Sequence, residues 1–207
     1  MIRKTIYLIR HGQTDYNKRG IVQGSGVDTN LNHIGELQAR AFYQSYHHIP
    51  FEHIYTSSLK RTHQTVSPFL EKNIPTEVLP ELNEINWGEL EGKVPDEFSK
   101  RQFYHQVSRW KDGHLNESVN GGETPLQMLE RQKKGLKIIE KNTASPILIC
   151  MHGRAMRGFL CLLTGQSLSN MDNFPHDNLS LYVLEKNQTN PFYTISIHNS
   201  LQHLQHI

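Results

Sequence analysis

Cysteine is scarce in this chain of 207 residues, which contains only Cys150 and Cys161. Two cysteines in unlike surroundings exclude a disulfide framework and favour a reducing compartment. Long apolar runs are also lacking. The apolar stretch of "MIRKTIYLIRHG" is too short and too soon interrupted by charge for a signal peptide or a membrane span, and "MRGFLCLL" is equally short. We therefore expect a soluble, cytoplasmic protein with no membrane partner.

Charge of one sign is lacking as well. Lys and Arg total 22 against 20 Asp and Glu, so the net charge is +2 with histidine neutral. This balance, together with the absence of a dense basic tract, argues against nucleic acid as a partner. A local positive patch that binds a small anionic ligand remains compatible with it.

Strand-like and helix-like segments alternate along the chain. Apolar, strand-like runs occupy residues 5–10, 51–57, 75–79, 146–152, 179–185 and 192–198. The first and fourth are continuously apolar at their centres, as in strands covered on both faces, whereas the last two alternate and belong nearer a sheet edge. This order predicts an α/β fold, specifically a three-layer α/β/α sandwich with a mostly parallel central sheet.

Helix signals lie between the strands. Asn32 is expected to cap a helix that carries Ile34, Leu37, Ala41 and Phe42 at helical spacing, and Ser58 is a candidate cap for a helix that Pro68 should kink or end. Thr124, Pro125 and Gln127 form the pattern of a capping box. A further helix follows His152-Gly153 directly and should stop at Gly165.

Residues 86–122 differ from the rest because they are polar, with scattered aromatic residues and with glycines at both ends. They are typical of an excursion over a sheet, and such insertions often shape a site. We expect one domain, 1–207, with a cap-like insertion at about 93–120 over the active site. Trp87 and Trp110 flank this insertion and are expected to form local core.

Two apolar strands end in unusual residues. The first runs into Arg10-His11-Gly12 and the fourth into His152-Gly153. Ligands of open α/β sheets bind beyond the carboxyl ends of the strands, where helix starts favour anions and glycine lets the backbone approach a ligand. Residues 10–17, 57–61 and 152–153 are therefore expected to supply one pocket.

Such a pocket suits a phosphate monoester. The planar guanidinium groups of Arg10 and Arg61 match phosphate oxygens, and the neutral imidazole of His11 could attack phosphorus to give a phosphoryl-histidine. Two nearby arginines should keep His11 unprotonated. His152 would stabilise charge on the transferred group. A carboxyl must protonate the leaving alcohol, and "PELNEINWGELEG" offers four: Glu81, Glu84, Glu89 and Glu91.

Six blocks in order carry a resemblance to a known family: "LIRHGQTDYN", "TSSLKRTHQT", "LNEINWGELEG", "GGETPLQMLER", "MHGRAMRGFL" and "DNLSLYVLE". Together they span nearly the whole chain and resemble the histidine phosphatase superfamily, the phosphoglycerate mutase-like proteins (branch 1). The ending "HNSLQHL" is similar to that of several small bacterial phosphatases in the family.

The resemblance implies a role for each matching residue. His11 would accept the phosphoryl group, and Glu84 would donate a proton and later act as base for water. Arg10, Arg61 and His152 would form the phosphate pocket, and secondary contacts would come from Asn17, Gln23 and the backbone of Gly153. No metal and no other cofactor is implied, since the arginines and the second histidine already bring positive charge.

Three functions are compatible with these residues. The favoured one is a phosphohydrolase acting on a small phosphorylated metabolite. A cofactor-dependent phosphoglycerate mutase would use the same residues, but only about thirty residues separate Gly92 from "GGET", which favours a site more open to water. A non-catalytic module that binds phosphate esters ranks last, because every expected catalytic position is filled. The physiological ester and the oligomeric state do not follow from the sequence.

Thirteen histidines raise the question of a metal site. His47-His48 and the tail set His198, His203 and His206 have suggestive spacing. No Cys or Asp completes a tight ligand set near them, so we expect mostly surface histidines and no metal.

Overall fold

The computed structural model describes residues 4–187 and 189–207, and its centre is a six-stranded sheet. The strands are β1 (Lys4–Arg10), β2 (His53–Thr56), β3 (Thr76–Val78), β4 (Ile147–Met151), β5 (Leu181–Lys186) and β6 (Thr194–Ser200). Their order across the sheet is β3-β2-β4-β1-β5-β6. The pairings among β3, β2, β4 and β1 are parallel, and β5 and β6 add antiparallel pairings at one side. The expected mostly parallel sheet, with the last strand at an edge, is confirmed.

Alternating side chains of the central strands feed two separate cores, one on each face. Ile6 and Leu8 of β1 point into the core that includes Met128 and Met156, whereas Ile9 points into the core that includes Phe42. Successive side chains of a strand face opposite sides, so a continuously apolar strand must be covered twice. The strands β1 and β4 therefore sit between two layers.

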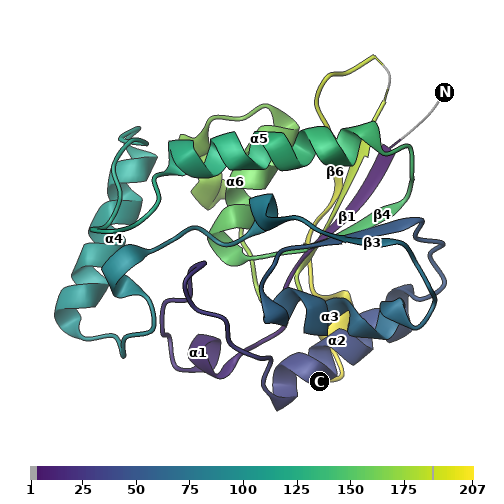
Figure 1. The fold of residues 1–207 in the computed structure, drawn as a ribbon, viewed down its shortest axis with the longest axis horizontal. Helices are drawn as coiled ribbons and strands as arrows, with labels where there is room; N and C mark the ends of the chain where they lie inside the picture. Colours follow the sequence, from purple (N-terminus) through teal and green to yellow (C-terminus); the bar gives the residue numbers. More distant parts are fainter. Residues whose placement is uncertain (1–3, 188) are drawn as a thin grey trace.

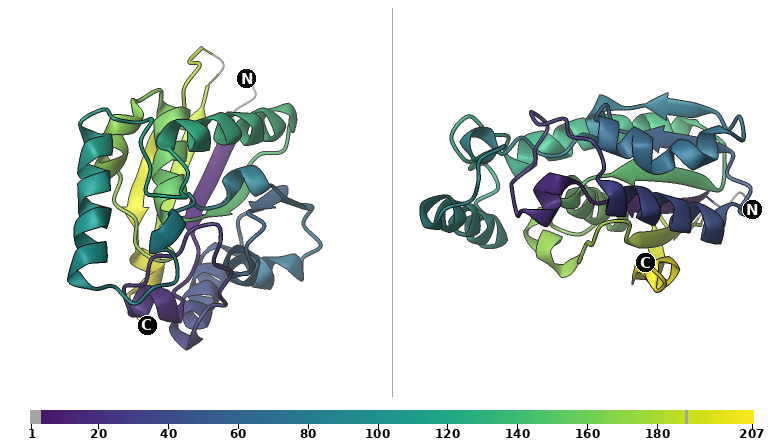
Figure 2. Two further views of the ribbon diagram at one scale, coloured as in Figure 1. Left: turned by 60° about the vertical axis from the view of Figure 1, so that its left-hand side comes forward. Right: turned by 90° about the horizontal axis from the view of Figure 1, so that it is seen from below.

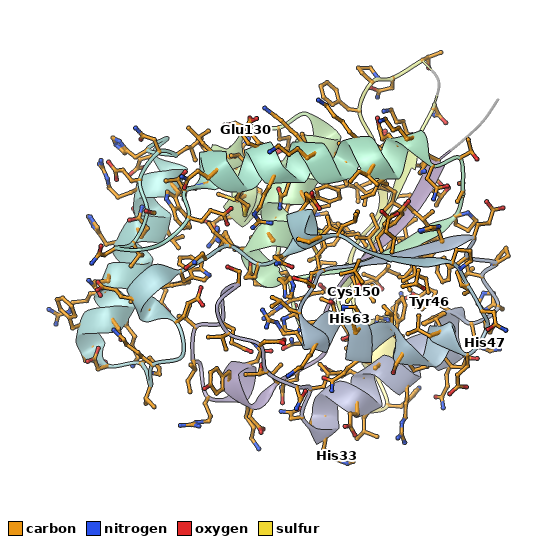
Figure 3. The ribbon with its side chains drawn as sticks, in the orientation of Figure 1. His33, Tyr46, His47, His63, Glu130 and Cys150 are labelled. Carbon is orange, nitrogen blue, oxygen red and sulfur yellow. The ribbon has the colours of Figure 1, made fainter. Side chains whose placement is uncertain are left out.

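Four helices supply those layers (Figure 1). On one face lie α2 (His33–Tyr46) and α3 (Lys60–Leu70), and on the other lie α5 (Pro125–Lys141) and α6 (Gly153–Thr164). Glu130 lies on the outer side of α5, away from the sheet (Figure 3). The three-layer α/β/α sandwich expected from the sequence is the observed fold. Among the described residues, no helix has both the length and the apolar character to cross a membrane.

Most of the expected helix boundaries are found. Asn32 Oδ1 accepts from the backbone N of Gly35 at 2.9 Å, and Thr124 and Gln127 form the capping box of α5. Gly165 ends α6 in the left-handed region with φ 72. These helix ends are set by local interactions, since each depends on residues within one turn of the helix.

The expected cap of α3 was wrong, and of the two outcomes expected at Pro68, a kink or an end, the helix does not end there. The helix starts after Leu59, and Ser58 does not cap it because the Ser58 hydroxyl donates to Asn83 Oδ1 at 2.8 Å instead. The helix also runs past Pro68 to Leu70. Pro68 has no N–H to offer the carbonyl of Gln64, and the hydroxyl of Ser67 donates to that carbonyl at 2.9 Å in its place.

The insertion folds outside the sandwich. Its helix α4 (Glu97–Lys111) lies outside the layers formed by α2, α3, α5 and α6, beyond one end of the sheet (Figures 1 and 2). Trp110 is 1% exposed and its ring lies 5.2 Å from that of Trp87, so the two tryptophans form local core as expected. Short helices complete the chain: α1 (Asp15–Lys18), η1 (Pro80–Leu82), η2 (Gly88–Leu90), η3 (Leu168–Asn173) and η4 (Gln202–Leu204).

Candidate active site

The carboxyl ends of β1 and β4 lie side by side and bring the two His-Gly pairs together. Arg10 is in register with Met151, and the backbone N of His11 donates to the carbonyl of Met151 at 3.0 Å. The rings of His11 and His152 are 5.1 Å apart, centroid to centroid. The three sequence segments expected to supply one pocket do meet at this edge of the sheet.

His11 is 2% exposed and its tautomer follows from one contact. Its Nδ1 lies 2.8 Å from the carbonyl oxygen of Gly12. A carbonyl only accepts, so Nδ1 carries the proton and Nε2 keeps a free lone pair. Among the described residues, no hydrogen-bond partner for Nε2 is found. Burial first, and then the charges of Arg61 and Arg10, hold the pKa of His11 well below its ordinary value of 6.5.

Gly12 is required for a different reason from the one expected. A Cβ on Gly12 would lie 2.7 Å from the carbonyl oxygen of Gly35 in α2. Glycine here therefore lets a helix, rather than a ligand, approach the backbone. The backbone N of Gly12 donates to the Thr65 hydroxyl of α3 at 3.0 Å, so both helices of this face fix the residue next to His11.

Arg61 is fully buried, next to His152. Its Nε donates to His152 Nδ1 at 3.1 Å, and its Nη1 and Nη2 donate to the carbonyls of Val27 at 2.6 Å and Gly24 at 3.2 Å. Burial, as the largest cause, lowers the pKa of Arg61 to about 10. Because a guanidinium has five N–H groups, two remain for a ligand after these three contacts.

Both ring nitrogens of His152 contact protein groups. Since Nδ1 accepts from Arg61, Nε2 carries the proton and donates to Ser57 Oγ at 2.8 Å. Burial, and next the charge of Arg61, hold the pKa of His152 well below 6.5. Ser57 lies within the expected 57–61 segment, but its hydrogen bond to His152 was not anticipated.

Glu84 is held at the start of α6. Its Oε1 accepts from the backbone N of Ala155 at 2.7 Å and of Ile85 at 2.9 Å, and its Oε2 accepts from the backbone N of Arg154 at 3.0 Å. Two of these donors are free N–H groups of the first turn of the helix. Within the described residues Oε2 accepts one hydrogen bond and Oε1 accepts two, so Oε2 keeps a second position that can carry a proton. Of the four glutamates in this segment, Glu84 shares a cavity with His11. Glu91 instead accepts from the backbone of Trp87 and Gly26.

A cavity of about 230 Å³ opens above His11. Its walls include six residues predicted from the sequence, namely Arg10, His11, Asn17, Gln23, Glu84 and Gly153, together with Trp87, Phe103, Arg154 and His176. Arg61 and His152 lie behind His11 and are not part of these walls. The structure thus brings all eight predicted residues together but divides them into two layers.

The amide side chains of Asn17 and Gln23 contact their own loop. The Asn17 Oδ1 accepts from the backbone N of Thr14 at 3.2 Å and from Asn178 Nδ2 at 3.2 Å. Gln23 Nε2 donates to the Thr14 hydroxyl at 2.7 Å, and Gln23 Oε1 accepts from the Thr29 hydroxyl at 2.5 Å. These bonds hold the 14–29 loop against the cavity.

His176 was missed by sequence reasoning. Its Nδ1 lies 3.3 Å from Arg10 Nη1, and its backbone carbonyl accepts from the same Nη1. Burial, followed by the charges of Arg10 and Arg157, lowers the pKa of His176 to about 2. A Cβ on Gly153 would lie 3.1 Å from the His176 ring, so glycine at 153 makes room for it. Arg10 Nε is buried without a partner among the described residues, as suits a group that awaits an anion.

The charged side chains that act on His11 are cations, which do not bind a metal ion. Metal ligands are anionic or neutral donors, whereas the groups nearest His11 include the guanidiniums of Arg10 and Arg61. Within the described part of the chain, no group of three His, Cys, Asp or Glu side chains has the arrangement of a metal site.

Comparison with known proteins places the chain in a family. The family model described as the Histidine phosphatase superfamily (branch 1) matches residues 6–195. The chain belongs to this superfamily, as its six sequence blocks indicated. Homologues named as phosphatases support phosphomonoester hydrolase activity.

Individual relatives carry different names. Phosphoserine phosphatase 1 of Hydrogenobacter thermophilus is 28% identical over 181 residues, with 86% of this chain and 85% of that protein covered. A 2,3-bisphosphoglycerate-dependent phosphoglycerate mutase of Bartonella henselae is 27% identical over 178 residues, covering 79% and 83%. The crystal structure of the alpha-ribazole phosphatase from Shigella flexneri superimposes with a TM-score of 0.80 at 25% identity, covering 95% of this chain and 96% of that chain.

Proposed function

We propose that the protein is a phosphohydrolase that removes phosphate from a small phosphorylated metabolite through a phosphohistidine at His11. The observation that carries this proposal is the hydrogen bond from His11 Nδ1 to Gly12 O, at 2.8 Å. It leaves the Nε2 lone pair free at the floor of a cavity. The lowered pKa keeps that lone pair unprotonated at neutral pH, as a nucleophile requires.

The reaction then has two steps. In the first, the Nε2 lone pair forms a bond to phosphorus while the bond from phosphorus to the alcohol oxygen breaks, and Glu84 gives its proton to that oxygen. In the second, Glu84 takes a proton from water, the water oxygen bonds to phosphorus, and the bond from phosphorus to Nε2 breaks. Orthophosphate leaves, and both residues return to their starting states.

The phosphate is bound by charged groups from both layers of the site. Arg10 contributes the unpartnered buried Nε, and the backbone N of Gly153 lies at the start of α6, where an anion is favoured. Arg61 and His152 act from behind His11, and Arg61 has two N–H groups to spare. Asn17 and Gln23 supply secondary contacts from the loop that they hold. No cofactor or metal takes part.

A mutase would use the same residues, and one relative is named as such. Hydrolysis is favoured because the cavity above His11 adjoins a second one of about 420 Å³ between residues 19–22 and α4, which gives water a route to the phosphohistidine. A non-catalytic module fits less well, since the nucleophile and the proton donor line one cavity. We also propose a cytoplasmic location, which suits two cysteines that are both free thiols.

The test is turnover of p-nitrophenyl phosphate by the His11→Ala variant. We expect a loss of activity of more than about 1000-fold, since a missing nucleophile is not replaced by its neighbours. His63→Ala is the matched control, because His63 lies on α3 (Figure 3) and is not among the residues that line the cavity. A His11→Ala variant with wild-type turnover would overturn the mechanism.

The mutase alternative is tested with 3-phosphoglycerate and a small amount of 2,3-bisphosphoglycerate, the cofactor in the name of the mutase relative. Release of orthophosphate without 2-phosphoglycerate is the expected result. Interconversion of the two phosphoglycerates with little phosphate released would make the protein a mutase instead.

A further inference from the structure

We propose that Arg154 determines specificity by binding a carboxylate on the leaving group, so that the preferred substrates are phosphate esters of small hydroxy acids or amino acids. This inference rests on the proposed phosphohydrolase function. It concerns the half of the substrate that departs, for which none of the residues discussed above provides a charge partner.

Arg154 lies on the leaving-group side of the cavity. Its backbone N donates to Glu84 Oε2 at 3.0 Å, and Glu84 must lie beside the oxygen that it protonates. Arg154 lines the same cavity as Glu84 and His11, and its side chain is 7% exposed. An anion carried by the departing alcohol would therefore enter within reach of this guanidinium.

The guanidinium of Arg154 is held but only partly neutralised. Its Nη1 donates to Asp172 Oδ1 at 2.9 Å, and the same oxygen also accepts from Arg157 Nη1. Two guanidiniums thus share one carboxylate, which leaves one positive charge uncompensated. Arg157 does not line the cavity, and its buried Nε has no partner among the described residues, so Arg154 is the member of the pair that a substrate can meet.

Packing against aromatic rings orients the Arg154 guanidinium. Its guanidinium carbon lies 5.7 Å from the centre of the Trp110 ring, and Trp110 packs on Trp87, which packs on Phe103 at 4.7 Å. A guanidinium stacked on one face of an aromatic ring still presents N–H groups at its edge. Those groups match the two oxygens of a carboxylate in a bidentate arrangement.

The size of the cavity favours a carboxylate over a second phosphate. Its volume of about 230 Å³ is below the roughly 300–1000 Å³ of sites for drug-sized ligands. The phosphoryl group takes part of this space. A carboxylate is planar and smaller than a second tetrahedral phosphate, so it suits what remains.

A second set of cations lies farther out. Arg19, Lys93 and Lys100 line the adjoining cavity of about 420 Å³. Lys100 pairs with Glu97, and these side chains are exposed to solvent, which weakens their attraction for an anion. Arg154, buried and anchored, is the stronger candidate, and Lys93 provides the competing variant.

The experiment compares 3-phosphoglycerate with glycerol 3-phosphate, which carries a hydroxymethyl group in place of the carboxylate. The readout is the ratio of their kcat/KM values, with phosphate release as the assay. We expect the wild type to prefer 3-phosphoglycerate. Arg154→Met should lower the ratio about 10- to 100-fold, as is usual for a lost charged hydrogen bond, because kcat/KM falls for 3-phosphoglycerate and much less for glycerol 3-phosphate. The ratio for Arg154→Lys should lie between those of the wild type and of Arg154→Met.

Two further variants test whether the effect belongs to Arg154 itself. Arg157→Met removes a charge from the same Asp172 without touching the cavity, and it should keep the ratio within about threefold of the wild type. Asp172→Asn frees Arg154 from its partner and should raise the ratio, so the inference stays testable even where Arg154→Met does not fold.

Several results would overturn the inference. The first is a wild type that does not prefer 3-phosphoglycerate, and the second is an equal loss of kcat/KM on both substrates in Arg154→Met. The third is a ratio of kcat/KM values that Asp172→Asn leaves unchanged or lowers. The fourth is a ratio that falls in Lys93→Met but not in Arg154→Met. A wild type that hydrolyses no phosphate ester at all would instead overturn the proposed function.

Discussion

The backbone of Gly35 in α2 packs directly against that of Gln13, two residues after the proposed nucleophile. A Cβ on Gly35 would lie 2.1 Å from the carbonyl oxygen and 2.8 Å from the nitrogen of Gln13. The neighbouring contact is also close, since a Cβ on Gly12 would lie 2.7 Å from the carbonyl oxygen of Gly35. The position of His11 therefore depends on a helix that contributes no side chain to the cavity.

The first prediction concerns this contact. Gly35→Ala should lower the free energy of unfolding by about 1–3 kcal/mol or more, because backbone atoms cannot yield to the added methyl group as side chains do. It should also lower kcat, since the strand end that carries His11 must shift. Chemical denaturation and p-nitrophenyl phosphate turnover are the measurements. Ser45→Ala, at an exposed position of the same helix, is the control and should leave both unchanged. If Gly35→Ala kept the wild-type stability and turnover, the contact between Gly35 and Gln13 would not determine either quantity.

The second prediction separates proton donation from phosphate binding. Glu84→Gln cannot give a proton to a leaving alcohol, so hydrolysis of an alkyl phosphate should fall about 100- to 1000-fold. The fall should be much smaller for p-nitrophenyl phosphate, whose leaving group departs without a proton. Glu89→Gln is the matched control, because Glu89 is exposed and outside the cavity. Equal losses on both esters in Glu84→Gln would assign the proton to another group.

The main elements were predictable because their signals are local. Continuous apolar runs marked β1 and β4, and the caps at Asn32, Thr124 and Gly165 each depend on atoms within one helical turn. Parallel neighbouring strands place their carboxyl ends together, so the meeting of His11 and His152 followed once the fold class was known.

Other features could not be predicted from the sequence, because they depend on contacts that form only in the folded chain. The hydroxyl of Ser58 has a partner 25 residues away in Asn83, which competes successfully with a capping role. The position of Arg61 behind His11 depends on carbonyls of the 24–27 loop, and nothing in the sequence reveals where a loop carbonyl will point. His176 lies in a loop between η3 and β5, without periodicity to mark it.

The third prediction follows from a histidine that is buried in its neutral form. The pKa of His176 falls from 6.5 to about 2 on folding, mainly through burial and the charge of Arg10. Below about pH 6.5 the unfolded chain binds a proton that the folded chain does not, so stability is complete above that pH and decreases as the pH falls toward 2. His176→Asn should therefore reduce the loss of unfolding free energy between pH 7.5 and pH 5.0, by up to about 2 kcal/mol.

The control for this pH effect is His48→Asn, at an exposed position. It should leave the pH dependence of unfolding unchanged, whereas His176→Asn flattens it. Urea denaturation at the two pH values gives both numbers. An unaltered slope in His176→Asn would mean that the folded protein admits a proton at His176.

The last prediction concerns the insertion, which meets the cavity through α4. Phe103 lines the cavity and its ring lies 4.7 Å from that of Trp87, whereas Phe98 on the same helix is 69% exposed. Phe103→Ala should raise KM for phosphate esters about tenfold, because the leaving group loses apolar contact there. Inhibition by orthophosphate should stay unchanged, since the proposed phosphate site is at Arg10. Phe98→Ala, the same substitution five positions away, should alter neither quantity. Equal effects of the two variants would mean that α4 stabilises the fold without shaping the site. If Phe103→Ala weakened the binding of orthophosphate as well as raising KM, α4 would contribute to binding of the phosphate and not of the leaving group.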